Sequence, residues 1–137
     1  MCRFKGRFQD QEYCSSKAID QIIADGKESI PKLISQITDN RWIKEPVYDY
    51  WPQIRAGELA VFILNDLFLD DTWQHRTMPD LFDAKKCDES ASVCWERFRK
   101  NHSLANIQRH WMNFWMTNKD NIYWDNKSRC FRLMKKK

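Results

Sequence analysis

The sequence predicts a mostly α-helical fold: a compact bundle of about five helices around a buried central helix at residues 56–70, with a short C-terminal β-hairpin. Residues 56–70 are apolar around most of a helical wheel, which is typical of an enclosed helix. The chain has only three glycines and four prolines, too few for the many tight turns of a multi-stranded β fold. No low-complexity linker divides its 137 residues, so we expect a single domain over residues 1–137.

The central helix is predicted by an almost unbroken apolar run. Between Leu59 and Leu69, only Ala60, Asn65 and Asp66 are not large apolar residues. A surface helix carries one apolar stripe, whereas a helix that is apolar on most sides must be covered on most sides. The run is too short and too interrupted to cross a bilayer, which requires about 20 predominantly apolar residues.

Two helices are expected before the central one. Residues 9–25 carry apolar side chains at helical spacing, and Gly26 supplies a stop. Ser29 is the expected N-cap of the second helix, with Pro31 in its first turn, where the missing N–H costs nothing. The apolar face of this second helix is Ile30, Leu33, Ile34 and Ile37, and the helix ends at Asp39 and Asn40.

Two further helices and a hairpin are expected after the central helix. Residues 90–101 follow Asp88 and Glu89 and end in basic residues, an arrangement that complements the helix dipole. Ser103 is the expected N-cap of a last long helix. Its apolar face is Leu104, Ile107, Trp111, Phe114 and Trp115. Residues 122–124 and 129–133 flank a four-residue turn and predict a hairpin, which needs a helix to pack on.

An aromatic connection, residues 41–55, precedes the central helix. Pro46 and Pro52 forbid a continuous helix through it. Connections longer than about 12 residues in a compact domain are usually functional or disordered, and the aromatic content argues against disorder. The aromatic residues are Trp42, Tyr48, Tyr50 and Trp51. Two interpretations stay open: a lid folded over the central helix, or an interface for a partner.

The segments IPKLISQITD and RAGELAVFILNDLF, within residues 30–68, resemble one unit of a HEAT-type helical repeat. The sequence departs from that pattern by inserting the aromatic connection and by showing no second copy, whereas an array needs about three repeats. The resemblance therefore implies helix–turn–helix packing and no solenoid. The whole chain also resembles small exported bacterial proteins, among them immunity proteins that neutralise toxins delivered by type VI secretion. That resemblance implies a periplasmic protein that binds another protein.

Five cysteines are many for a chain of this length. In an oxidising compartment they predict disulfides, and in the cytoplasm they would be buried, inert thiols. The candidate bridges join Cys87 to Cys94 and Cys14 to Cys130, which leaves Cys2 unpaired. Cys2 follows Met1 directly, so we expect either a natural start here or a mature exported form whose Cys2 carries a lipid.

Neither a metal centre nor an active site is predicted. Cys87, Cys94, His102 and His110 offer zinc ligands, but the spacing C-x6-C-x7-H-x7-H is wider than the intervals of about two to five residues in structural zinc sites. Asp70, Asp71 and His75 lie close in sequence, yet no nucleophile elbow or phosphate-binding loop accompanies them. We therefore expect a protein that is not an enzyme and that binds no metal or cofactor; a small enzyme built on these three residues is an alternative.

The charge is strongly polarised along the chain. Residues 39–94 carry a net charge of −5, residues 95–137 carry +8, and the whole chain carries +4. The basic C-terminal third raises the alternative of a nucleic-acid-associated protein, but its Trp111 and Trp115 lie on the predicted core face of their helix. Aromatic residues beside acidic ones suit an interface with a basic partner, such as a toxin or effector surface. The predicted partner-binding residues are Trp42, Tyr48, Asp49, Tyr50, Asp70 and Asp71.

Overall fold

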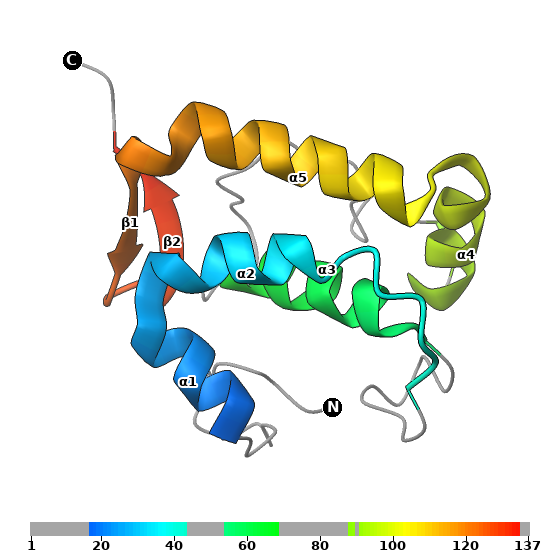
Figure 1. Ribbon diagram of the computed structural model, residues 1–137, viewed down its shortest axis with the longest axis horizontal. Coiled ribbons are helices and arrows are strands. Elements are labelled where there is room, and N and C mark those ends of the chain that lie inside the picture. Colours follow the sequence, from blue (N-terminus) through cyan, green and yellow to red (C-terminus); the bar gives the residue numbers. More distant parts are fainter. Residues whose placement is uncertain (1–16, 44–53, 69–87, 90, 135–137) are drawn as a thin grey trace.

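The computed structural model describes residues 17–43, 54–68, 88, 89 and 91–134. The described part is mostly helical and ends in a two-stranded antiparallel hairpin, so the predicted fold class is confirmed in this coarse form. The helices are α1 Lys17–Asp25, α2 Ser29–Ser35, α3 Ala56–Leu67, α4 Ala91–Asn101 and α5 Leu104–Asn118, and the strands are β1 Ile122–Asp125 and β2 Cys130–Leu133. In Figure 1, α5 runs alongside α2 and α3, the hairpin closes one end of these helices, and α4 lies at the other end.

Gly26 marks the predicted stop between the first two helices. It has a φ of 66° and begins the 3-10 turn η1, Gly26–Glu28, which redirects the chain into α2. A positive φ is readily adopted only by glycine, which explains why the helix stops here. The predicted N-cap at Ser29 is wrong. Ser29 is already helical, and its hydroxyl donates to the Gly26 carbonyl over 2.7 Å instead of accepting from a helix N–H.

The apolar run predicted as the central helix forms α3 and is buried on most sides. Its buried residues are Gly57, Glu58, Ala60, Val61, Phe62, Ile63, Leu64 and Leu67. The helix ends at Leu67, with Phe68 in a turn, so it is shorter than the predicted 56–70. The prediction of a single central helix is also not matched. The shorter helix α2 contacts α1, α3 and α5, so it too lies among the other helices. The centre of the molecule is therefore shared between α2 and α3.

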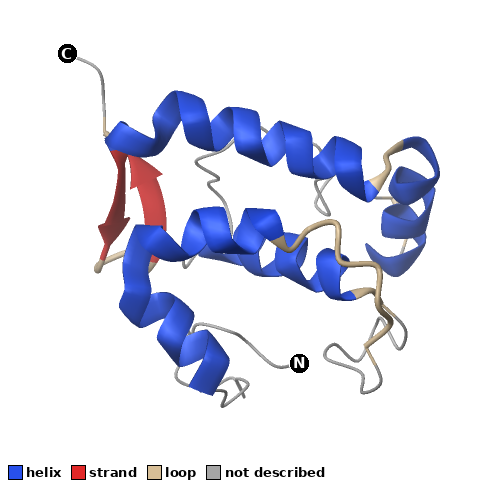
Figure 2. Ribbon diagram, in the orientation of Figure 1, coloured by secondary structure: helices blue, strands red, loops and turns tan. Residues whose placement is uncertain are grey.

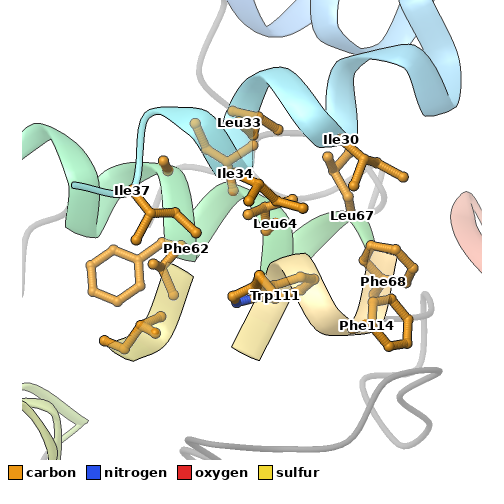
Figure 3. Packing of buried hydrophobic residues seen from close by; sticks show 14 of the residues in the cluster. Ile30, Leu33, Ile34, Ile37, Phe62, Leu64, Leu67, Phe68, Trp111 and Phe114 are labelled. Carbon is orange, nitrogen blue, oxygen red and sulfur yellow. The ribbon is translucent and has the colours of Figure 1, made fainter. Parts of the chain in front are cut away.

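Figure 3 shows the core between α2, α3 and α5. Ile30, Leu33 and Ile34 of α2 face Leu64 of α3 and the aromatic side chains of α5. Phe68 lies among three rings, with centroid distances of 5.7 Å to Trp111, 5.4 Å to Phe114 and 5.6 Å to Phe131. Because Phe131 belongs to β2, this aromatic cluster joins the hairpin to the helices.

The C-terminal part follows the predicted local signals closely. Ser103 is the N-cap of α5, and its hydroxyl accepts a hydrogen bond from the Asn106 N–H over 3.0 Å. The hairpin pairs Ile122 with Leu133 and Asp125 with Cys130, and β2 packs on α3, as a lone hairpin requires. Figure 2 shows that these are the strands of the described part, which is otherwise helix and loop. Among the described residues, no helix has the length and apolar character needed to cross a membrane.

Candidate functional site

One of the six predicted partner-binding residues, Trp42, lies in the part of the chain that the structure describes. Tyr48, Asp49 and Tyr50 of the aromatic connection lie outside the described residues, and so do Asp70 and Asp71. His75, which completes the alternative catalytic set, also lies outside them. The candidate site is therefore the surface around Trp42.

An isolated antiparallel bridge pairs Trp42 with Arg55 at the two ends of the aromatic connection. The Ile43 N–H donates to the Ile54 carbonyl over 2.9 Å, and the Ala56 N–H donates to the Arg41 carbonyl over 2.8 Å. These bonds hold residues 41–43 beside residues 54–56 at the start of α3 (Figure 1).

Trp42 is the most prominent apolar side chain near this bridge. It is 56% exposed, and the Arg55 guanidinium carbon lies 4.0 Å from the centroid of its ring. The Arg55 guanidinium also donates through Nη1 to the Asn40 carbonyl over 2.7 Å. A guanidinium stacked on an indole is held by the ring quadrupole, so Arg55 restricts the orientation of an exposed indole. This arrangement lowers the entropy that Trp42 would lose on contacting a partner.

A pocket of about 390 Å³ opens beside Trp42, between the start of α3 and the last turns of α4. One side is lined by Trp42, Ile54, Arg55 and Glu58, and the other by Trp95, Glu96, Arg99 and Lys100. The volume lies within the range of about 300–1,000 Å³ that is typical of ligand sites. Its floor is apolar, because Ile54 and Trp95 are both buried.

Glu58 joins the two sides of the pocket. Its carboxylate is buried and accepts hydrogen bonds from the Arg55 N–H over 3.0 Å and from the Trp95 indole N–H. Its Oε2 also lies 3.6 Å from Arg99 Nε. A buried carboxylate is tolerated when donors surround it in this way. Glu58 therefore fixes α4 against α3, assisted by an edge-to-face contact between Phe62 and Trp95 with ring centroids 4.8 Å apart.

The carboxylate of Asp39 lies beside the bridge and is held by its own neighbour. Arg41 donates to Asp39 Oδ2 over 2.6 Å, and this side-chain hydrogen bond lowers the pKa of Asp39 to about 2. The Arg41 backbone N–H donates to the same carboxylate and acts in the same direction. Asp39 is therefore paired with the exposed Arg41, and the pair does not line the pocket.

No family model, curated protein or solved structure matches this chain. The resemblances to a HEAT-type unit and to exported immunity proteins therefore stay expectations, and the functional argument rests on the geometry of this pocket.

The structure describes two of the five cysteines, Cys94 and Cys130. Cys94 of α4 is disulfide-bonded, while Cys130 is buried and its thiol is not in a disulfide bond. The predicted bridge between Cys14 and Cys130 is therefore not present. Cys130 instead lies at the start of β2 as a completely buried side chain. Cys2, Cys14 and Cys87 lie outside the described residues, so the Cys87–Cys94 pairing stays a prediction.

Of the four candidate zinc ligands, Cys94, His102 and His110 are described and Cys87 is not. Within the described part of the chain, no group of three or more His, Cys, Asp or Glu side chains is close enough to hold a metal ion. His102 stacks on Phe98 with ring centroids 4.1 Å apart, and its Nδ1 donates to the Phe98 carbonyl over 3.0 Å. The His102 ring is thus packed against α4.

Sequence reasoning missed most of the pocket. Arg55 and Glu58 are three residues apart, and Trp95 and Arg99 are four apart, so each pair shares a helix end or face. One signal was available: Glu58 is an acidic residue within an apolar helix, and such a residue requires a buried partner. The identity of that partner, 37 residues further along the chain, could not be read from the sequence.

Proposed function

We propose that this protein is a non-catalytic binding protein that recognises another protein through Trp42 and the pocket beside it. The observation that carries the proposal is an exposed indole, oriented by Arg55, at the rim of a pocket with a buried apolar floor. Protein interfaces concentrate their binding energy in a few aromatic and arginine side chains at well-packed positions.

The specific form that we propose is an exported immunity protein that binds and neutralises a secreted antibacterial toxin. Its support is the resemblance of the whole chain to such proteins, its cysteine content and the aromatic residues next to acidic ones in residues 41–71. The expectation of a basic toxin surface depends on the acidic residues Asp49, Asp70 and Asp71, which lie outside the described residues.

The nucleic-acid alternative has less support from the described residues. Trp111 is 2% exposed in the core, so it offers no face on which a base could stack. The indole of Trp124 is half-buried, donates to Asn126 Oδ1 and packs edge-on against Phe131. The basic charge of the C-terminal third is therefore not accompanied by exposed indoles at these two positions.

Replacement of Trp42 by alanine tests the proposal. The tagged protein is incubated with the product of the gene adjacent to its own, and the affinity of the complex is measured by calorimetry. We expect Trp42→Ala to weaken binding about thirtyfold, because truncating a central aromatic residue of an interface costs about 2 kcal/mol or more.

Met116→Ala is the matched control for Trp42→Ala. Met116 is 58% exposed on α5, so its truncation removes a similarly exposed apolar side chain from another part of the surface. Both variants should keep the wild-type stability within about 0.5 kcal/mol, as surface substitutions usually do. Equal affinities of the two variants for the partner would show that Trp42 is not part of the interface.

A thiol count tests the exported form of the proposal. If the protein works in an oxidising compartment, the native protein unfolded without reductant should show fewer than five reactive thiols, because disulfides persist there. Protein purified from its native cells is alkylated in denaturant, with and without prior reduction, and the mass shift is compared. Five reactive thiols before reduction would contradict export.

A further inference from the structure

The pocket beside Trp42 is rich in hydrogen-bond donors that the described residues leave unused. Arg99 donates through Nη1 to the His102 carbonyl over 2.6 Å, while its Nη2 donates to no described residue. Lys100 is exposed and forms no ion pair with a described residue, and the Trp42 indole N–H likewise has no described acceptor. Arg55 uses Nη1 for the Asn40 carbonyl and keeps its Nε and Nη2 free of described acceptors.

The acceptors of the pocket are fewer. Both oxygens of Glu58 are engaged, one by the Arg55 backbone N–H and the other by the Trp95 indole, with Arg99 alongside. Glu58 thus positions Arg99 and is not offered to a ligand. The remaining carboxylate, Glu96, is exposed like Lys100, so solvent screens both charges. The less exposed cation of the pocket is Arg99, which lies beside Glu58.

Arg99 has a buried nitrogen in its guanidinium group. Its Nε is buried and has no hydrogen-bond partner among the described residues, although Glu58 Oε2 lies 3.6 Å away. The guanidinium is thus held near a carboxylate without full hydrogen-bonding. The Arg99 side chain is 22% exposed, so its Nη2 edge can reach an added acceptor while Nε stays buried beside Glu58. A carboxylate at that edge would form a charge-assisted hydrogen bond.

The apolar part of the pocket limits what accompanies that acceptor. Ile54 and Trp95 form a buried floor and Trp42 forms an exposed wall. A volume of about 390 Å³ has room for one or two side chains and is too small for a helix, whose diameter with side chains is about 10–12 Å. An extended segment with one apolar side chain beside an acidic one fits both the apolar residues and the cationic residues of the pocket.

We propose that this pocket binds an acidic peptide segment of the protein partner, with a carboxylate against Arg99 and Lys100 and a neighbouring apolar side chain against Trp42 and Ile54. The inference rests on the proposed function, because it names the chemistry of the segment that the binding protein recognises. At this pocket it differs from the expectation of a basic partner surface, which depends on acidic residues outside the described part. A carboxylate is the acceptor-rich group that a protein partner can supply, and guanidinium–carboxylate pairs are among the stronger hydrogen-bonded contacts.

Peptide titrations followed by NMR test this pocket directly. The probe is acetyl-Gly-Glu-Phe-Glu-Gly-amide, compared at low salt with the same peptide carrying Gln or Lys in place of both Glu residues, and with inorganic phosphate. In 15N-labelled protein, the acidic peptide should shift the indole N–H signals of Trp42 and Trp95 and the Nε–H signal of Arg99. The Gln peptide should bind about tenfold more weakly, because charge-assisted hydrogen bonds are roughly twice as strong as neutral ones.

Lys100→Gln and Lys127→Gln form a matched pair of variants. Each removes one exposed positive charge, but Lys127 lies in the hairpin turn at the opposite end of the molecule from α4 (Figure 1). Lys100→Gln should weaken binding of the acidic peptide about threefold and Lys127→Gln should leave it unchanged, as expected for one partly solvated ion pair.

Three results would overturn the inference: equal binding of the Glu and Gln peptides, equal effects of the two lysine variants, or shifts with phosphate but not with the acidic peptide. The titration uses no natural partner, so its failure is distinguishable from failure of the proposed function. Suppose that the adjacent gene product binds in a way that depends on Trp42, but that all the peptides bind equally. The proposed function would then be supported and the acidic segment would be excluded.

Discussion

Gly57→Ala should destabilise the protein by about 3 kcal/mol, a cost at the upper end of those measured for overpacked sites. A Cβ added at Gly57 would lie 1.8 Å from the Ile37 carbonyl oxygen and 2.6 Å from its carbonyl carbon. Alanine normally favours a helix over glycine by roughly 0.5–1 kcal/mol, but here the gain is outweighed by a clash with main chain. The free energy of unfolding in urea measures the effect.

The clash cannot be relieved by rotating a side chain. Ile37 is completely buried in the turn after α2, and the Gly57 N–H donates to the Asp39 carbonyl over 2.8 Å, so both partners are fixed. The first turn of α3 would have to move away from that turn. Because Glu58 belongs to the same turn of α3, the Trp95 indole signal should also shift in this variant.

Gly26→Ala is the control, because the two glycines are required for different reasons. A Cβ at Gly26 meets nothing within 4 Å, but the residue has a φ of 66°. The cost there is the left-handed conformation alone, about 1–2 kcal/mol. If Gly57→Ala were as stable as Gly26→Ala or more so, α3 would not lie against the turn after α2 as described.

The elements that the sequence predicted well are those with local signals. The hydroxyl cap at Ser103 and the stop at Gly26 each depend on interactions within a few residues, and the hairpin turn depends on four consecutive residues. The predicted cap at Ser29 shows the limit of such signals. A serine before an apolar run also fits a helix that has already begun in a 3-10 turn, with the hydroxyl bonded backward.

What the sequence could not predict depends on contacts between distant segments. The apolar run of α3 indicated enclosure, but not that α2 would share the central place, since α2 is only seven residues long. The need for glycine at position 57 arises from its close approach to the Ile37 carbonyl, a contact between segments 20 residues apart. The pocket likewise requires the first turn of α3 to lie beside the last turns of α4. The spacing of apolar residues along the sequence does not predict that contact.

Trp111→Ala should destabilise the protein by about 3–5 kcal/mol, the range for truncating a large buried aromatic residue. Trp111 is 2% exposed on α5, and its ring centroid lies 5.7 Å from that of Phe68 and 5.9 Å from that of Phe114. The loss of stability has two parts: the lost burial of the indole and the cavity that it leaves. The cavity would lie between α5, α2 and the end of α3, so closing it would require all three to move (Figure 3).

Met112→Ala, one residue further along α5, separates burial from helix propensity. Met112 is 37% exposed, and alanine is at least as good a helix former, so its truncation should change the free energy of unfolding by less than about 0.5 kcal/mol. Equal effects of the two substitutions in urea unfolding would mean that α5 does not present Trp111 to α2 and α3. A large loss for Trp111→Ala alone would establish that this tryptophan serves the core. Trp42 differs from it, because its indole is 56% exposed and can contact a partner.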